Sequence, residues 1–470
     1  MMDEHSLTRR TFLKASAASS LAAMTAGRAA GEGAASPATN VLFINTDQQR
    51  KDTLACYGNA AVQTPHLDAL AARGTKFDSC YVTQPVCSPC RSSMATGLFP
   101  NATTVVENNI HLPGELFAWP RAMQAAGYRT AYIGKWHLGV EPVPDYFDLW
   151  RGYHTGWPHF VREAPFYTPP GESDSAFRAR LAQVQPATVE GDSLIGRYRP
   201  DIETDYAIDF LRENRDRPFA CWLSYYPPHT PKDAPKENIA LYEGKIEPHG
   251  QAVYHAMVNR LDWNIGRLMA EMDALGLREK TLIIFTSDHG ENYPMHWNKH
   301  LKRLCNDQSA NVPLIISLPG VLPEGKEISN VASSADLCPT MLDLCGLPVS
   351  DGLHGKSMKR LLHGDAAGWH EDVFIQNSPY RTWVDKTDDE DPDMRERCVV
   401  TDEWKLILNT SRPPELYDRQ AAEPDKENLF GKSETRAVAH DLARRMAAWA
   451  ENTGDDIAVR LLGQWADAIG

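Results

Sequence analysis

Residues 87–97 read Cys-Ser-Pro-Cys-Arg-Ser-Ser-Met-Ala-Thr-Gly, and the rest of the chain is organised around this stretch. Ser88 belongs to the residue types that cap helices, and Pro89 suits a first turn because a missing N–H costs nothing there. The stretch therefore predicts a helix start, with Cys87 at the positive end of the helix dipole and Arg91 one turn further along. Such a place can hold an anion beside a reactive side chain. Two nearby cysteines are also compatible with simple burial or with a weak metal site.

The complete string distinguishes between these alternatives. Cys-x-Pro-x-Arg followed by Thr96-Gly97 resembles the signature of the type I sulfatases, which belong to the alkaline-phosphatase-like superfamily. The resemblance implies hydrolysis of sulfate monoesters by a cysteine that a formylglycine-generating enzyme has oxidised to formylglycine (3-oxoalanine). It assigns this modification to Cys87, whose hydrated aldehyde would be the nucleophile, and it implies that Arg91 steadies the modified residue.

The composition is that of an ordinary globular protein. The 470 residues are 42% hydrophobic and 23% charged, a length that suits a large core and about two domains. A net charge of −14 argues against nucleic acid as a partner. A sulfated substrate is also anionic, so its attraction must come from a local cluster of basic side chains. No apolar run of 18 residues follows the N-terminal segment, and we expect no stable membrane insertion.

The N-terminal segment predicts export. Residues 8–14 read Thr-Arg-Arg-Thr-Phe-Leu-Lys and precede an Ala-rich, mildly apolar run. This pattern is typical of a twin-arginine signal peptide, which we place at residues 1–30 and expect to be removed. The twin-arginine machinery exports folded proteins, so we predict a periplasmic or secreted protein whose Cys87 matures beforehand in the cytoplasm. Nine irregularly spaced cysteines do not predict a disulfide framework.

Short apolar runs alternate with helical patterns along most of the chain. Helical patterns occupy residues 205–214 and 254–275, and the runs typical of buried parallel strands are 41–44, 129–133, 219–225, 281–286 and 312–318. This alternation predicts an α/β fold with a doubly wound, mostly parallel sheet that binds ligands at the carboxyl ends of its strands. The resemblance implies that this sheet is of the alkaline-phosphatase-like type.

The pattern changes near residue 371. Short β runs separated by charged residues, followed by an amphipathic helix, predict a small antiparallel sheet with one helix packed on it. The runs are 373–375, 398–400 and 405–408, and the helix lies near 436–451. We therefore predict a catalytic α/β domain at residues 38–370 and a smaller C-terminal α+β subdomain at 371–470. The run Glu-Leu-Tyr-Asp at 415–418 resembles the C-terminal signature of the sulfatases.

Two pairs of polar residues follow predicted strands. Asp47 and Gln48 end the first strand, and Asp288 and His289 follow a later one. An Asp at a strand end is more often a turn or cap residue, but two such pairs beside the Cys87 motif favour a metal site. Their oxygen-rich donor set suits a hard divalent cation such as calcium. The resemblance implies calcium bound by these four residues and the modified Cys87, although many family members carry Asp and Asn in place of Gln48 and His289.

Other motifs predict the residues that handle the sulfate group. Residues 134–139 read Gly-Lys-Trp-His-Leu-Gly, where Lys135 and His137 lie on one side of an extended segment. The resemblance implies that Lys135 bridges the nucleophile and the sulfate, and that His137 assists turnover. It also implies that His229, in Pro-Pro-His-Thr-Pro, binds the sulfate or protonates the leaving group.

Two further positions are predicted from their spacing within the family pattern. Lys302 stands ten residues before Val312, where the family places a sulfate-binding lysine, and Lys299 is the alternative if a loop insertion has shifted the register. Asn108, twenty-one residues after Cys87, matches an asparagine that contacts the transferred group, with a plain turn residue as the alternative.

These features together predict hydrolysis of a sulfate monoester on a sulfated small molecule or glycan, with a sulfated carbohydrate favoured. Specificity is expected from aromatic-rich loops at residues 142–171 and 380–394. One alternative is a phosphonate monoester or phosphodiester hydrolase of the same superfamily, which would share the two metal pairs but carry Tyr and Thr in place of Lys135 and His137. Another is a catalytically silent binding protein whose Cys87 never matures.

Overall fold

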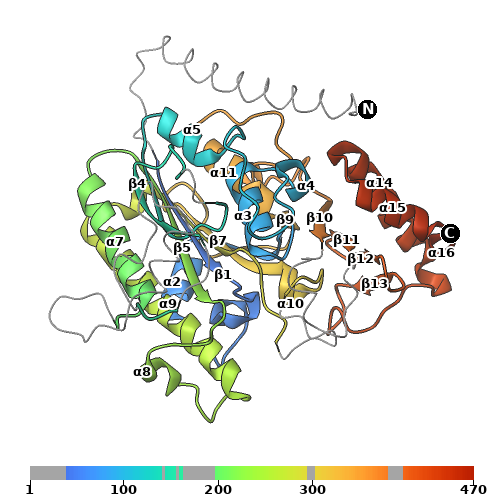
Figure 1. Cartoon of the computed structure of the whole chain (residues 1–470), viewed down its shortest axis with the longest axis horizontal. Helices are drawn as coiled ribbons and strands as arrows, with labels where there is room; N and C mark the ends of the chain where they lie inside the picture. Colours follow the sequence, from blue (N-terminus) through green and yellow to red (C-terminus); the bar gives the residue numbers. More distant parts are fainter. Residues whose placement is uncertain (1–38, 140–142, 155–157, 162–195, 294–301, 379–394) are drawn as a thin grey trace.

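The computed structural model describes residues 39–139, 143–154, 158–161, 196–293, 302–378 and 395–470 (Figure 1). The predicted signal peptide, Lys299, the 380–394 loop and parts of the 142–171 loop lie outside these residues. None of the helices within the described ranges is long and apolar enough to span a membrane.

A nine-stranded sheet forms the centre of the molecule. Its order is β4-β3-β5-β1-β6-β7-β2-β8, and β9 also pairs with β2. The strands are β1 Asn40–Asp47, β2 Thr75–Tyr81, β3 Arg129–Lys135, β4 Leu149–Tyr153, β5 Phe219–Pro228, β6 Thr281–Ser287, β7 Asn311–Ser317, β8 Lys326–Ile328 and β9 Ala332–Ser333. Four of the predicted strands become β1, β3, β5 and β6, which pair in parallel as expected.

The direction predicted for the fifth strand was wrong. The run at 312–318 becomes β7, which pairs antiparallel with both β6 and β2. A buried apolar run carries no information about strand direction, and the segment between β6 and β7 contains only the four-residue helix α10, Asp307–Ala310, among the described residues. Strand β2, at 75–81, was not predicted because its sequence, Thr-Lys-Phe-Asp-Ser-Cys-Tyr, mixes polar and apolar residues.

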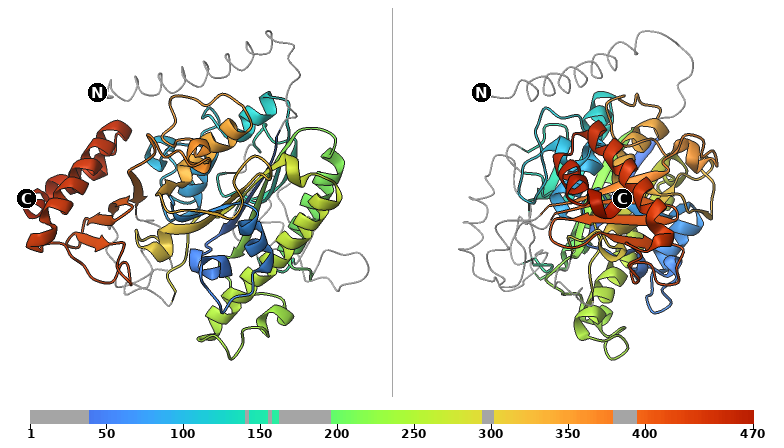
Figure 2. Two further views of the ribbon diagram at one scale, coloured as in Figure 1. Left: turned by 180° about the vertical axis from the view of Figure 1, so that it is seen from behind. Right: turned by 90° about the vertical axis from the view of Figure 1, so that its right-hand side faces the viewer.

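Helices cover both faces of this sheet, as predicted for a doubly wound fold (Figures 1 and 2). On β1, Val41 and Phe43 face one core while Leu42 and Ile44 face the other, since side chains alternate along a strand. The first core also holds side chains of α3 Cys87–Thr96, α5 Trp119–Ala125 and α11 Leu337–Leu344. The second holds those of α2 Pro65–Ala72, α7 Arg199–Asn214 and α9 His249–Ala274. Short helices α4 Pro100–Thr103, α8 Lys236–Ile239 and α12 Lys359–Leu362 lie in the connections.

The C-terminal part forms a second, antiparallel sheet in the order β10-β11-β12-β13. Its strands are β10 Asp372–Asn377, β11 Glu396–Thr401, β12 Trp404–Asn409 and β13 Glu415–Asp418. The predicted helix is α14, Arg436–Thr453, but two more follow it, α15 Asp456–Gln464 and α16 Ala466–Ile469. The prediction of a single helix was therefore wrong.

The two faces of the small sheet bury different cores. Residues such as Val373, Val400 and Ile407 belong to the core of the large sheet. The opposite face carries Phe374, which stacks on Trp449 of α14 with ring centroids 4.8 Å apart. The predicted boundary near residue 371 therefore separates two sheets but not two independent cores.

Candidate active site

Helix α3 begins two residues earlier than a Ser88 cap predicts. Val86 is its N-cap residue, and Cys87, Ser88 and Pro89 form the first turn, all buried. Ser88 does not cap the helix, because its Oγ donates to the His137 carbonyl at 2.6 Å. Asn108 Oδ1 instead accepts the backbone N–H of Ser88 at 3.0 Å, which satisfies one of the N–H groups that a first turn leaves unpaired.

The strand register brings the two acidic residues together. Strands β1 and β6 are parallel neighbours in which Thr46 pairs with Ser287, so Asp47 and Asp288, the next residue on each strand, emerge side by side. The carboxyl ends of parallel strands meet at the same edge of a sheet. The backbone N–H of Gln48 donates to Asp288 Oδ1 at 3.1 Å.

Four of the predicted residues form one compact group. The ligating atoms of Asp47, Cys87, Asp288 and His289 all lie within 4.8 Å of one another, and all four residues are buried. His289 Nε2 lies 3.2 Å from Cys87 Sγ, 3.6 Å from Asp288 Oδ1 and 3.7 Å from Asp47 Oδ1.

Arg91 holds the outer oxygens of both carboxylates. Its Nη2 lies 3.1 Å from Asp47 Oδ2 and its Nε lies 2.8 Å from Asp288 Oδ2, while Nη1 donates to Ser224 Oγ at 2.7 Å. The Oδ1 atoms are thereby left to face Cys87 and His289. Burial and Cys87 oppose ionisation of Asp47, but the positive charges of Lys135 and Arg91 hold the pKa of Asp47 well below its usual range.

The group has the properties of a divalent-cation site. His289 Nδ1 donates to the Gly290 carbonyl at 2.8 Å, so its Nε2 lone pair points at the carboxylate oxygens. Gln48 Oε1 is buried and has no hydrogen-bond partner among the described residues. Carboxylate and amide oxygens with one imidazole fit such a cation, and the buried Gln48 Oε1 is left available as a ligand because it accepts no hydrogen bond from the described residues.

Lysines enclose Cys87 as well. Lys135 Nζ lies 2.5 Å from Asp47 Oδ2 and 3.6 Å from Cys87 Sγ, and Lys302 Nζ lies 3.3 Å from Cys87 Sγ. Burial alone would raise the pKa of the Cys87 thiol, but Lys135 and Lys302 hold that pKa well below its usual range. The position therefore favours negative charge. The structure places Lys302 at the site.

His229 contacts Lys302 through its second nitrogen. Nδ1 donates to the Thr230 carbonyl at 2.7 Å, so Nε2 carries no proton in the neutral ring and accepts from Lys302 Nζ at 3.2 Å. Burial, followed by the charge of Lys302, lowers the pKa of His229 to about 4. Tyr226 stacks on the His229 ring at 4.9 Å, and His159 Nε2 donates to the His229 carbonyl at 2.9 Å.

His137 reaches the site by a route that the sequence did not indicate. Strand β3 ends at Lys135, and His137 has a left-handed backbone with φ of 59°, so the two side chains do not share one side of an extended segment. The His137 ring lies close enough to Cys87 to affect the pKa of that thiol. Gly134 permits the close approach of β3 to β5, because a Cβ there would lie 1.9 Å from the Ser224 carbonyl oxygen.

Several residues at the site were missed by the sequence analysis. Glu291 accepts from Gln48 Nε2 at 2.7 Å and forms an ion pair with Lys232. Ser224 bonds Arg91, and Tyr226 and His159 support His229. The available signal for Glu291 was its place two residues after His289 at the same strand end. The others come from β5 and its surroundings, and only strand pairing reveals them.

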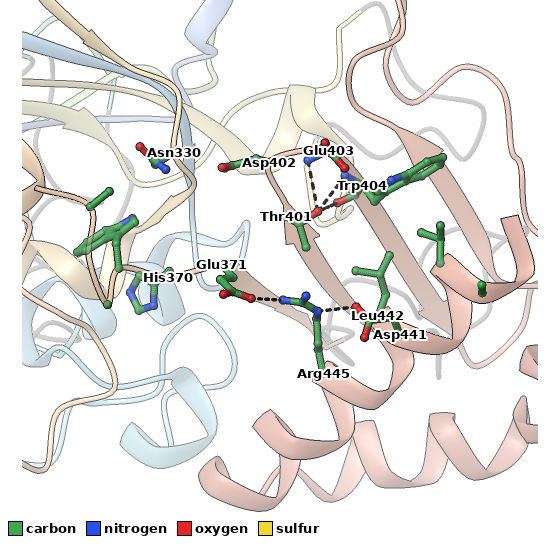
Figure 3. Close-up of a pocket in the computed structure, with 15 residues that line it drawn as sticks. Asn330, His370, Glu371, Thr401, Asp402, Glu403, Trp404, Asp441, Leu442 and Arg445 are labelled. Atoms are coloured by element: carbon green, nitrogen blue, oxygen red, sulfur yellow. Dashed lines mark hydrogen bonds and ion pairs between the residues drawn. The ribbon is translucent and has the colours of Figure 1, made fainter. Parts of the chain in front are cut away.

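A pocket of about 700 Å³ lies elsewhere, between the small sheet, α14 and the loop before β10 (Figure 3). In it, Arg445 bonds Glu371 at 3.1 Å and Asp441 at 2.7 Å, and Asp402 and Glu403 add further acidic side chains (Figure 3). A lining with this excess of carboxylates would repel a sulfate group. The Cys87 group, with its two lysines, is therefore the candidate site for an anionic substrate.

Known proteins resemble this chain over most of its length. Residues 39–347 match the sulfatase family model. The chain belongs to the sulfatase family. Residues 296–452 of this sulfatase also match the C-terminal model of N-sulphoglucosamine sulphohydrolase. The protein is accordingly a sulfuric ester hydrolase, and the family match does not favour the phosphonate alternative.

Individual relatives of this sulfatase cover most of its length. An ulvan-active sulfatase of Formosa agariphila is 28% identical, over 90% of this chain and 83% of the relative. An N-acetylglucosamine-6-O-sulfatase of Bacteroides thetaiotaomicron is 25% identical, over 84% of this chain and 83% of the relative. The fold is shared with a protein solved in complex with its substrate, D-glucosamine-2-N,6-O-disulfate; the TM-score is 0.74, the identity 23%, and the match covers 89% of this chain and 99% of the other.

Proposed function

We propose that this sulfatase removes sulfate from a carbohydrate, with Cys87 matured to formylglycine as the nucleophile and calcium as the bound cation. The observation that carries the proposal is the surroundings of Cys87 Sγ, which lies in a carboxylate–imidazole group and within 3.6 Å of both Lys135 Nζ and Lys302 Nζ. The carbohydrate preference is supported by the sulfated-sugar substrates named for two relatives and a solved neighbour.

The proposed reaction has two covalent steps. One hydroxyl of the hydrated aldehyde at residue 87 attacks sulfur, the ester S–O bond breaks, and the alcohol leaves with a proton. The remaining hydroxyl then loses its proton, the C–O bond to sulfate breaks, and the aldehyde returns and is hydrated again. The cation would supply positive charge that favours the deprotonated form of the attacking hydroxyl.

The chain's own residues are assigned roles from their contacts. Lys135, fixed by Asp47, and Lys302 neutralise the sulfate oxygens with charge-assisted hydrogen bonds. Arg91 keeps Asp47 and Asp288 aligned as ligands. Burial, followed by Lys135, lowers the pKa of His137 to about 3, so this ring is neutral near pH 7, and we assign it to assist the second step. Asn108, whose Oδ1 accepts the backbone N–H of Ser88 at the start of α3, is assigned to contact the transferred group.

Lys302 is a better proton donor to the leaving alcohol than His229. His229 presents an unprotonated Nε2 to Lys302, whereas the Lys302 ammonium carries protons and lies 3.3 Å from Cys87 Sγ. His229 then holds Lys302 in place and contributes to sulfate binding.

This assignment predicts a dependence on the leaving group. Lys302→Gln should lose about 10²- to 10⁴-fold in kcat/KM on a sugar sulfate, the usual scale of general acid catalysis, and much less on 4-nitrophenyl sulfate, whose leaving group needs no proton. His229→Gln should lower kcat/KM on both substrates by similar factors. Steady-state kinetics of both variants on both substrates provide the test, and a leaving-group effect confined to His229→Gln would reverse the assignment.

The substrate class is tested with a panel of sulfated sugars, aryl sulfates and phosphonate monoesters. We expect the highest kcat/KM for one of the sulfated sugars. A preference for the phosphonate esters would contradict the proposed substrate, because Lys135 and Lys302 are assigned here to a sulfate group.

The remaining parts of the proposal concern the whole chain. We propose that residues 1–30 direct twin-arginine export to the periplasm or beyond, and that a formylglycine-generating enzyme acts on Cys87 before export. Residues 38–370 would then form the catalytic domain, and residues 371–470 a C-terminal subdomain that shares its core.

A further inference from the structure

The side chain of Gln48 has one bonded end and one open end. Its Nε2 donates to Glu291 Oε2 at 2.7 Å. Because a carboxylate only accepts hydrogen bonds, the atom that faces Glu291 must be the amide nitrogen, and the oxygen is turned away from Glu291. That oxygen, Oε1, is buried without a hydrogen-bond partner in the described part of the chain.

The backbone of Gln48 is held by hydrogen bonds at both its N–H and its carbonyl group. Its N–H donates to Asp288 Oδ1 at 3.1 Å, and its carbonyl accepts from the Tyr254 hydroxyl at 2.7 Å. Its φ of 68° lies in the left-handed region, which few residues other than glycine adopt. With the backbone held, the contact with Glu291 decides which end of the amide is bonded and which end is left without a partner.

Glu291 is built into the core as a partner for that amide. It is fully buried, and its charge is balanced by an ion pair with Lys232. Lys232 is itself held, since its Nζ donates to the Pro228 carbonyl at 2.9 Å and lies 4.2 Å from the centre of the Tyr254 ring. Glu291 does not belong to the compact group of Asp47, Cys87, Asp288 and His289, and it contacts Gln48 instead.

We propose that Glu291 is a positioning residue that sets the orientation of the Gln48 amide, so that Oε1 and not Nε2 is offered to the divalent cation. The inference rests on the proposed function, because it requires a cation held by Asp47, Asp288 and His289. It also accounts for an amide at position 48. A carboxylate there would face the Glu291 carboxylate with no donor between them, which is unfavourable in a buried site.

The test compares two double variants of equal charge. Lys232→Met/Glu291→Leu removes the ion pair and the acceptor of the Gln48 amide, whereas Lys232→Met/Glu291→Gln removes the same ion pair but keeps an amide oxygen that can accept. Each full-length protein is freed of metal with a chelator, its thermal unfolding is recorded by circular dichroism, and calcium ions are then titrated in by calorimetry. We expect the first variant to bind calcium about 10- to 100-fold more weakly than the second, the scale found when a partner of a metal ligand is lost.

Each outcome has a definite meaning. Equal calcium affinities in two variants with similar unfolding temperatures would show a merely structural role and overturn the inference. If Lys232→Met/Glu291→Leu does not fold, Gln48→Leu serves instead, because it removes Oε1 and leaves the Glu291–Lys232 pair; calcium affinity unchanged from wild type would again overturn it. A wild-type protein that binds calcium while the variants do not differ refutes the positioning role alone. A wild-type protein that binds no divalent cation refutes the metal site of the proposed function as well.

Discussion

Cys87→Ser is expected to lose multiple turnover by about 10⁴-fold or more, the scale seen when a catalytic nucleophile is removed, in a host whose maturing enzyme acts only on cysteine. A serine hydroxyl in this cationic setting can still accept the sulfate group. The resulting ester has no second hydroxyl on the same carbon to expel sulfate, so the reaction stops after the alcohol is released. Rapid-mixing kinetics should therefore show at most one equivalent of alcohol per site and almost no steady-state rate.

Cys90→Ala is the matched control for this experiment. Cys90 is buried in the same helix, its Sγ lies 3.6 Å from Ser334 Oγ, and it does not belong to the compact group of Asp47, Cys87, Asp288 and His289. This variant should keep a kcat/KM close to that of the wild type. Mass spectrometry of the peptide 77–91 from active enzyme should show an aldehyde in place of the first thiol. A fully unmodified peptide in a preparation that turns over would end the proposed mechanism, and an unmodified peptide without turnover would support the silent binding protein.

Asp288→Asn is expected to lose bound calcium and at least about 10²-fold in kcat/KM, a loss on the scale of one electrostatic contact to developing charge. Asp288 Oδ2 is held by Arg91 at 2.8 Å, while Oδ1 lies 3.6 Å from His289 Nε2. An amide at this position removes one negative charge and leaves only a single acceptor oxygen for both Arg91 and the cation. Elemental analysis of the purified variant and calorimetric titration with calcium measure the loss directly.

Asp262→Asn separates this effect from the general cost of altering a buried carboxylate. Asp262 is buried in α9 and accepts the backbone N–H groups of His66 and Leu67 at 3.2 and 2.7 Å, in a part of the structure that does not contain Cys87. This variant should lower the unfolding temperature without changing calcium content or kcat/KM. Wild-type protein that keeps full activity after chelation, with no divalent ion found, would contradict the role of the cation.

The carboxylate pairs show how far local sequence can lead. Asp47 and Asp288 each follow a run of buried apolar residues, and parallel strands place their carboxyl ends at one edge whatever their order. The prediction needs no knowledge of the strand order, and the structure brings Asp47, Asp288 and His289 together. The prediction could not show that Arg91 takes the Oδ2 atom of each carboxylate, because this contact joins three segments that are distant in the sequence.

Other features were beyond the reach of pattern alone. The predicted direction of β7 was wrong because an apolar run looks the same in either direction. The prediction that Lys135 and His137 share one side of an extended segment was wrong, because the left-handed backbone of His137 breaks the two-residue alternation of a strand. Helix α3 starts two residues earlier than a Ser88 cap predicts, and Asn108, twenty residues away from Ser88, accepts a hydrogen bond in its first turn.

The sequence by itself determined the α/β class and the small C-terminal sheet, and it supplied the motifs from which the nucleophile and the two metal pairs are proposed. Each of these depends on residue types at short spacing, where periodicity and backbone preference act. Only the tertiary structure decided which end of the Gln48 amide is open, which nitrogen of His229 faces Lys302, and that the small sheet shares the main core through Val373 and its neighbours. These depend on which segments meet in space, and a hydrogen bond or a packed face is set by the partner that tertiary folding supplies.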